Sequence, residues 1–80
     1  MKIKVLGPGC ANCKTLEART REALTQLNVN AEIEKVEDYD KIISYGIMRT
    51  PGLVIDEKVV VSGRVPTVEE IKKFVNSHLQ

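Results

Sequence analysis

The sequence predicts a single α/β domain over residues 1–80, in which a four-stranded mixed sheet is flanked by three helices in the order β-α-β-α-β-β-α. Short β-branched runs alternate with stretches whose apolar residues recur at helical spacing. A strand, a helix and a second strand at the start predict a parallel pair joined by a right-handed crossover. Two closely spaced apolar runs near the end predict an antiparallel hairpin in the same sheet.

The first strand is expected over residues 1–6, because the apolar run stops at the Gly-Pro-Gly break of residues 7–9. An amphipathic helix of about four turns follows and ends near Asn28. Most of its charged residues lie opposite an apolar stripe. The stripe comprises Cys13, Leu16, Thr20, Ala23, Leu24 and Leu27.

A second strand is expected over residues 30–36, where polar and apolar residues alternate imperfectly. Glu37 and Asp38 can then cap a short helix over residues 39–43. Gly46 stands where a residue in the left-handed conformation would end that helix.

The last part of the chain predicts a hairpin and a helix. The β-branched runs at residues 53–55 and 59–61 are separated by Asp56-Glu57-Lys58, the pattern of an antiparallel hairpin. Thr67 and Glu70 form a capping box at the start of the last helix. The buried stripe expected for this helix comprises Val68, Ile71, Phe74 and Val75.

The overall composition argues against several classes of function. Twelve basic and eleven acidic residues give a net charge of +1, whereas nucleic-acid binders and polybasic membrane anchors need concentrated positive charge. The apolar start is too short to span a bilayer or to serve as a signal-peptide core. We therefore expect a cytoplasmic monomer with no nucleic-acid or membrane partner.

The cysteine pair Cys10-Ala11-Asn12-Cys13 is the feature that points most strongly to chemistry. Two cysteines are too few to scaffold a secreted miniprotein, and cytosolic thiols stay reduced unless they cycle. The pair lies where the first helix begins, and there the helix dipole and unpaired N–H groups stabilise a thiolate. Residues three apart share one helical face, so the two sulfurs can close a disulfide.

The two positions predict different roles. Cys10 lies at the helix entrance and is expected to be exposed, whereas Cys13 shares the apolar stripe of Leu16 and is expected to be shielded. We therefore predict that the Cys10 thiolate attacks a disulfide of a partner protein and that Cys13 resolves the mixed disulfide. The chemistry needs no cofactor beyond the redox-active disulfide Cys10–Cys13.

Other interpretations of the pair stay open. The cysteines could be ordinary small buried residues, or they could bind a soft metal ion such as Cu(I) or a metalloid. Zinc prefers four ligands, and the chain offers only His78 besides, a residue better explained by the helix C-terminus beside it. The pair could also serve a redox-sensing interaction domain.

Thr50-Pro51 is the second informative site. Proline is tolerated at the first residue of a strand, and a strand is expected to begin just after Pro51. From the residues alone a trans bond is expected, because cis X-Pro bonds are a small minority in folded proteins. Beside this turn, Ile47 and Met48 could line an apolar docking groove or simply pack within the loop.

Together, the cysteine pair and the Thr-Pro turn resemble those of thioredoxin-fold proteins over essentially the whole chain. The shared features are a strand, a Cys-x-x-Cys at a helix start, Tyr45-Gly46-Ile47 leading to Thr50-Pro51, a hairpin, Gly63 and a terminal helix. In its compactness the chain is most similar to glutaredoxins and to the small archaeal and bacterial glutaredoxin-like thioredoxins. Its Gly9-Cys10-Ala11-Asn12-Cys13 sequence resembles that of the redox-active disulfide proteins.

The resemblance implies a thioredoxin-like fold and a thiol-disulfide oxidoreductase with a role in electron transport and cell redox homeostasis. Its partners would be protein disulfide substrates and a separate, unidentified reductase. The resemblance also implies that Pro51 follows a cis bond and packs against the active-site disulfide. Thr50 and Pro51 would then form the substrate-docking edge that faces Cys10.

The chain also departs from the better-known members of the family. Gly9 precedes Cys10 where those proteins carry Trp. The first strand carries Lys2 and Lys4 but no acid, so the carboxylate that assists the resolving cysteine in thioredoxins has no counterpart there. The base for Cys13 is therefore unassigned. The segment 62–65 lacks the paired glycine and acidic residues of glutaredoxins, which argues against glutathione binding.

Overall fold

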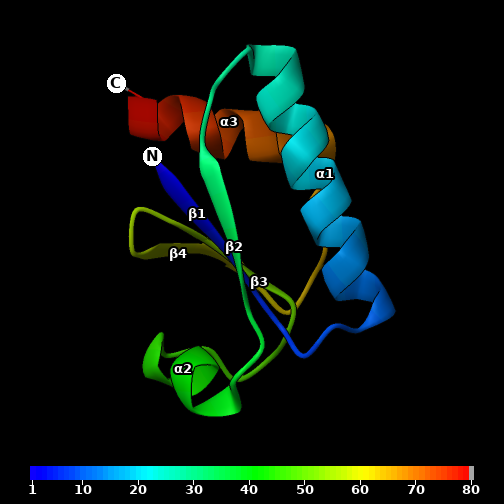
Figure 1. Ribbon diagram of the computed structural model, residues 1–80, viewed down its shortest axis with the longest axis vertical. Helices are drawn as coiled ribbons and strands as arrows, with labels where there is room; N and C mark the ends of the chain where they lie inside the picture. The colour runs from blue at the N-terminus through cyan, green and yellow to red at the C-terminus, as the bar shows by residue number, and fades with distance from the viewer. Residues whose placement is uncertain (80) are drawn as a thin grey trace.

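The computed structural model describes residues 1–79 and confirms the predicted element order (Figure 1). The strands and helices are β1 (Lys2–Leu6), α1 (Ala11–Leu27), β2 (Glu32–Val36), α2 (Tyr39–Ser44), β3 (Gly52–Ile55), β4 (Lys58–Ser62) and α3 (Val68–Leu79). None of the helices in this part of the chain has the length and apolar character needed to cross a bilayer.

The four strands form one mixed sheet in the order β2-β1-β3-β4. β1 pairs with β2 in parallel through the crossover helix α1, as predicted. β3 runs antiparallel to both β1 and β4. Because β1 and β3 are the two central strands, the loops that follow β1 and precede β3 meet at one end of the sheet, the end that carries Cys10 and Pro51.

Two apolar clusters lie on opposite faces of this sheet, because successive side chains of a strand alternate between faces. The larger cluster joins α1 and α3 to the sheet through residues such as Val5, Leu16 and Ile71. The smaller one lies under α2 and includes Leu6, Val36, Ile42, Ile47 and Val54. Figure 1 shows α1 and α3 side by side, with α2 set apart from them at the other end of the molecule.

Each helix begins at a capping side chain. Asp38 caps α2 by accepting from the Asp40 N–H at 2.9 Å. Thr67 and Glu70 form the predicted capping box, in which the side chain of each residue accepts from the backbone N–H of the other, at 3.2 and 3.1 Å. Helix α1 ends at Asn28, which adopts the left-handed conformation with φ 55°.

The structure corrects two predicted boundaries. β2 begins at Glu32 rather than at residue 30, because Glu32 pairs with Lys2, the first residue of β1. The β3–β4 turn contains two residues rather than three, since Lys58 already belongs to β4. Both turn residues have positive φ, 48° at Asp56 and 68° at Glu57, as a two-residue hairpin requires.

Glu57 is an unusual residue for such a turn, and its side chain explains how it is held there. Its carboxylate lies 2.7 Å from the Lys4 ammonium and accepts from the Tyr45 hydroxyl at 3.1 Å. The Glu57 hydrogen bond is the main reason that the pKa of Lys4 is raised. This network fastens the hairpin turn to β1 and to the end of α2.

Candidate redox site

Cys10 and Cys13 form a disulfide at the start of α1, with their Cα atoms 5.0 Å apart. Cys10 is the N-cap residue of the helix, and its sulfur accepts a hydrogen bond from the Cys13 backbone N–H at 3.2 Å. Cys10 is exposed, whereas Cys13 is only 5% exposed. The predicted difference in accessibility between the two sulfurs is therefore confirmed.

Gly7 explains how Cys13 is shielded. The loop after β1 passes so close to Cys13 that a Cβ atom added at Gly7 would overlap the Cys13 Sγ. The Gly7 N–H donates to the Val36 carbonyl at 2.9 Å, which fixes the loop to the end of β2. Only a residue without a side chain fits between these two contacts.

The Thr50–Pro51 bond is cis, as the resemblance implied and contrary to the expectation from the residues alone. The Gly7 position also relates this turn to the disulfide, because the same added Cβ would lie 3.8 Å from the Thr50 Cβ. Thr50 and Cys13 therefore both lie close to Gly7. Pro51 is buried, and its carbonyl accepts from the Gly63 N–H at 2.9 Å.

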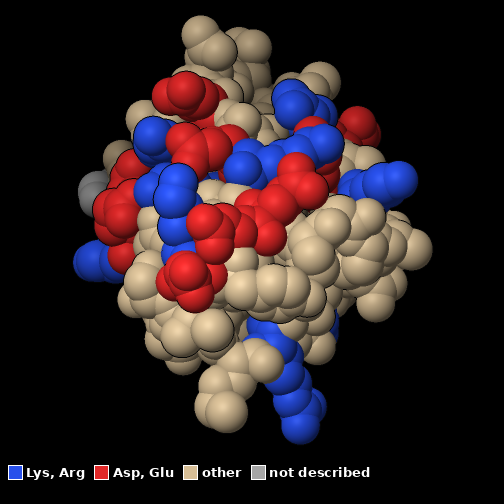
Figure 2. Space-filling view, turned by 60° about the horizontal axis from the view of Figure 1, so that its bottom comes forward, with Lys and Arg blue, Asp and Glu red and all other residues tan. Residues whose placement is uncertain are grey.

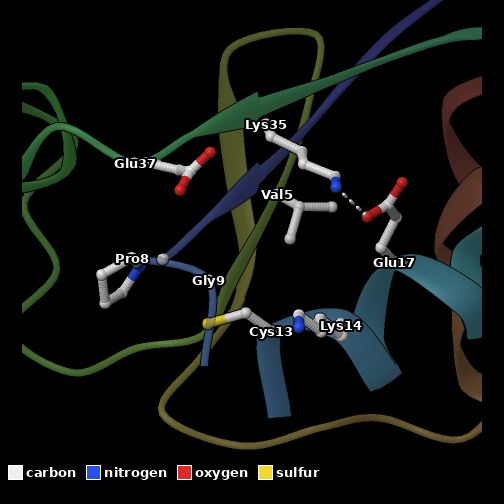
Figure 3. A pocket seen from close by; sticks show the side chains of 9 residues that line it. Val5, Pro8, Gly9, Cys13, Lys14, Glu17, Lys35 and Glu37 are labelled. Atoms are coloured by element: carbon white, nitrogen blue, oxygen red, sulfur yellow. Dashed lines mark ion pairs between the residues drawn. The ribbon is translucent and has the colours of Figure 1, made fainter. Parts of the chain in front are cut away.

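A cavity of about 270 Å³ opens beside Cys13 (Figure 3). Besides Cys13, its wall consists of Val5, the loop 7–9 and four charged residues: Lys14, Glu17, Lys35 and Glu37. Figure 3 shows Lys35 of β2 and Glu17 of α1 reaching toward each other across the cavity, with the Cys13 sulfur turned toward Gly9. The Cys13 sulfur thus borders a space with charged side chains in its wall, large enough for several water molecules.

The Glu17–Lys35 ion pair is the best-defined electrostatic feature of this cavity. The Lys35 ammonium lies 3.0 Å from the Glu17 carboxylate, and Arg21 approaches the other oxygen at 2.9 Å. The Glu17 side chain is only 15% exposed. Hydrogen bonds from Lys35 and then from Arg21 lower the pKa of Glu17, so this carboxylate stays charged at neutral pH.

Sequence reasoning did not assign Glu17, Lys35 or Glu37 to the site. They come from α1, from β2 and from the residue that follows β2, so only the packed fold shows that they share a wall with Cys13. One signal was present in the sequence: Glu17 follows Cys13 by four residues and therefore lies one turn along the same helical face.

A second hollow, of about 480 Å³, adjoins the Thr-Pro turn on the α2 side. It is lined by Tyr39, Ile42, Ile43, Ile47, Met48 and Thr50. Ile47 and Met48 were expected either to line a docking groove or to pack within the loop. Ile47 is buried in the smaller core, whereas Met48 is 98% exposed. Figure 2, which brings this end of the molecule forward, shows a broad area without charged side chains beside a band of mixed charge.

Within residues 1–79 no group of three or more His, Cys, Asp or Glu side chains is placed to hold a metal ion. His78 lies in the last turn of α3, where its Nδ1 is 3.0 Å from the Phe74 carbonyl. The position of His78 in the last turn agrees with its interpretation as a residue that complements the helix C-terminus.

Comparisons with known proteins agree with this geometry. Residues 1–76 match the protein family described as "Thioredoxin domain". A protein named thioredoxin from Methanothermobacter thermautotrophicus is 45% identical over 76 residues, which cover 95% of this chain and 99% of the relative. A second thioredoxin, from Methanocaldococcus jannaschii, is 36% identical over 78 residues, which cover 98% of this chain and 90% of the relative.

Proposed function

The chain belongs to the thioredoxin family and is a thiol-disulfide oxidoreductase, and from this premise we propose that it reduces client protein disulfides with Cys10 as nucleophile and Cys13 as resolving cysteine. The observation that carries the assignment of roles is the hydrogen bond from the Cys13 N–H to the Cys10 sulfur. A thiolate at Cys10 would keep this donor and gain the favourable end of the α1 dipole. Its exposure leaves the sulfur open to a client.

The reaction proceeds in two exchanges. The Cys10 thiolate attacks one sulfur of the client disulfide; a Cys10–client bond forms, and the other client sulfur leaves as a thiolate that takes up a proton. The Cys13 thiolate then attacks the Cys10 sulfur; the Cys10–Cys13 bond forms, and the second client sulfur leaves and is protonated. Two electrons and two protons pass to the client, and the protein is left as the disulfide described above.

We assign client docking to Thr50 and Pro51. In the described part of the chain, neither the N–H nor the carbonyl of Thr50 makes a backbone hydrogen bond, so both are available to an extended peptide. The hollow beside Thr50, with the exposed Met48 at its edge, would accept an apolar side chain of that peptide. This placement would bring a client disulfide close to the cysteine pair, because Thr50 and Cys13 both lie beside Gly7.

The remaining partners are proposed on the family relationship. A separate reductase would return the disulfide to the dithiol, and no cofactor would be needed, because the electrons are carried by Cys10 and Cys13. We further propose that the protein acts as a cytoplasmic monomer without a nucleic-acid or membrane partner. Mixed rather than single-sign charge on the face seen in Figure 2 supports the exclusion of nucleic acid.

The proposal is tested with the two single serine variants, using insulin as the disulfide client and dithiothreitol as the electron source. Cys10→Ser should lose the catalysed reduction. Cys13→Ser, reduced beforehand and freed of dithiothreitol, should perform the first exchange and stop at the mixed disulfide, which dithiothreitol would otherwise cleave. Since the chain has only two cysteines, the remaining thiol is unambiguous in each variant. Full activity in Cys10→Ser would overturn the assignment of the nucleophile.

A further inference from the structure

The resolving step places a chemical demand on Cys13 that its surroundings must meet. The attacking species is the thiolate, but Cys13 is 5% exposed, and burial disfavours the charged form of a thiol. β1 supplies no ionisable group to the cavity, because the residue it contributes to the wall is Val5. Any charge that adjusts the acidity of Cys13 must therefore come from the other elements around it.

Four charged side chains from two directions share the cavity wall with Cys13. α1 contributes Lys14 and Glu17, and the β2 end contributes Lys35 and Glu37. Lys14, Lys35 and Glu37 are all exposed, but within residues 1–79 only Lys35 is held by an ion pair. Lys14 and Glu37 therefore have no fixed partner, and solvent and salt screen their charges. Glu17 is the best shielded of the four, and it holds the ammonium of Lys35 at 3.0 Å.

We propose that the Glu17–Lys35 ion pair tunes the acidity of the resolving Cys13, with the Lys35 ammonium favouring the thiolate and the Glu17 carboxylate opposing it. Both are positioning residues, since they act on Cys13 through space and do not touch the client. This inference rests on the proposed role of Cys13 as the resolving cysteine. In this proposal, α1 and β2 supply the charges that adjust the pKa of Cys13, because the residue that β1 contributes to the cavity wall is the apolar Val5.

Contacts from two elements hold the Glu17–Lys35 ion pair at the wall of the cavity beside Cys13. Glu17 lies one helical turn after Cys13, and its second partner, Arg21, lies one turn further, so the carboxylate is held from two sides. Lys35 comes from β2, whose register with β1 places it opposite Val5, the residue that forms the cavity wall. The ion pair therefore bridges the two elements that enclose the inner side of the Cys13 sulfur.

The pKa of Cys13 can be measured directly in a Cys10→Ser background, where it is the only thiol and serine still provides an N-cap oxygen. The thiolate is followed by its ultraviolet absorbance against pH. Glu17→Gln, which keeps an oxygen for Lys35, should lower the pKa of Cys13, and Lys35→Met should raise it, each by about half a unit to one unit. The double variant should lie between the two single variants, near the parent.

Lys2 and Glu34 provide the matched control. They form a second β1–β2 ion pair, at 3.3 Å, and neither lines the cavity. Lys2→Met and Glu34→Gln should leave the pKa of Cys13 unchanged. Circular dichroism confirms that each variant is folded before it is titrated.

A pKa of Cys13 that does not move in folded Glu17→Gln and Lys35→Met, or that moves in the same direction in both, overturns the inference. The titration involves no client, so its outcome is separate from that of the insulin assay, which tests the proposed function. In the protein with both cysteines, the rate of mixed-disulfide resolution below the thiol pKa should rise about two- to threefold in Glu17→Gln and fall about as much in Lys35→Met. The change in thiolate fraction sets the direction, and the lower nucleophilicity of a more acidic thiol offsets part of it.

Discussion

The backbone N–H of Cys13 donates a hydrogen bond to the sulfur of Cys10 over 3.2 Å. Cys10 thus occupies the position that an Asp or Ser side chain takes in an ordinary helix cap. In the disulfide form, the Cys10 sulfur thus pairs one of the backbone N–H groups that the start of a helix leaves without a partner. After reduction, the same N–H group is available to a Cys10 thiolate. One contact therefore serves both the start of α1 and the reactivity of the exposed cysteine.

Because of this contact, Cys10 should be unusually acidic. In Cys13→Ser, where Cys10 is the only thiol, its pKa should lie below about 7.5, compared with about 8.5 for a free cysteine. The alkylation rate of the reduced protein against pH measures this value, and the same variant unfolded in urea is its control. A folded-state pKa at or above the unfolded one would contradict the role given to the helix terminus.

The same alkylation assay separates an exchange site from a soft-metal site. In metal-free buffer the reduced protein with both cysteines should react rapidly through Cys10, with no prior treatment with a chelator. Added Cu(I) should at most protect the pair while it is present. If instead both sulfurs of the purified protein react only after metal has been removed, a binding module would explain the cysteine pair better.

Gly7→Ala should damage the site directly, because the added Cβ would overlap the Cys13 sulfur. We expect a loss of about 1–3 kcal/mol in the free energy of unfolding, together with slower disulfide exchange. Gly46→Ala is the comparison: Gly46 has φ +82° but nothing within 4 Å of an added Cβ, so this variant should lose stability by backbone strain and keep the parent's exchange rate. Equal exchange rates in both variants would show that Gly7 does not shape the site.

The free energy of unfolding should decrease in acid, in part because the Glu70 carboxylate becomes protonated. Arg64, and then the Thr67 backbone N–H, lower the pKa of Glu70 from 4.5 to about 2. Because the folded-state value is the lower one, this carboxylate stabilises the fold above pH 4.5, and its contribution is lost as the pH falls from 4.5 toward 2. Urea unfolding at several pH values measures the effect.

Glu70→Gln should remove part of that acid dependence, with the contributions of the similarly paired Glu17 and Glu57 left in place. Glu69→Gln removes an equal charge from the neighbouring residue without disturbing the capping box, and it should keep the parent profile. An acid profile of Glu70→Gln identical to that of the parent would refute this account of the cap.

Substitutions at Met48 and Ile47 should have different effects, the first on client binding and the second on the stability of the fold. Met48→Ser should raise KM for insulin and change the free energy of unfolding by less than about 0.5 kcal/mol, since Met48 is 98% exposed. Ile47→Ala should instead cost about 2–5 kcal/mol of stability, because Ile47 is buried in the smaller core. Leu79→Ser, at an exposed apolar residue of α3, is the control for KM; an equal effect at Leu79 would argue against the hollow as a docking site.

Much of the fold could be predicted because local chemistry and the global arrangement agree. The apolar stripe of α1, the Thr67–Glu70 capping box and the exposure of Cys10 against the burial of Cys13 all follow from spacing along the chain. The cis bond before Pro51 followed from the family resemblance and not from the residues, whose intrinsic preference is for trans.

The features that escaped prediction depend on contacts between distant segments. The two-residue turn lacks the Asn-Gly signal of such hairpins, and Glu57 is held there by Lys4 and Tyr45, residues far away in the sequence. Likewise, Glu17 and Lys35 meet because α1 crosses over β1 to reach β2, a relationship that spacing alone does not define.

The most direct test of the exchange mechanism identifies which sulfur first bonds to a client. Pre-reduced protein is mixed with insulin, quenched by rapid alkylation of free thiols and digested without reduction, and the cross-linked peptides are mapped by mass spectrometry. The account predicts that the transient mixed disulfide joins insulin to Cys10, with Cys13 recovered as the alkylated thiol, and that Cys13→Ser accumulates the same adduct. A mixed disulfide mapped to Cys13 in the protein with both cysteines would contradict it.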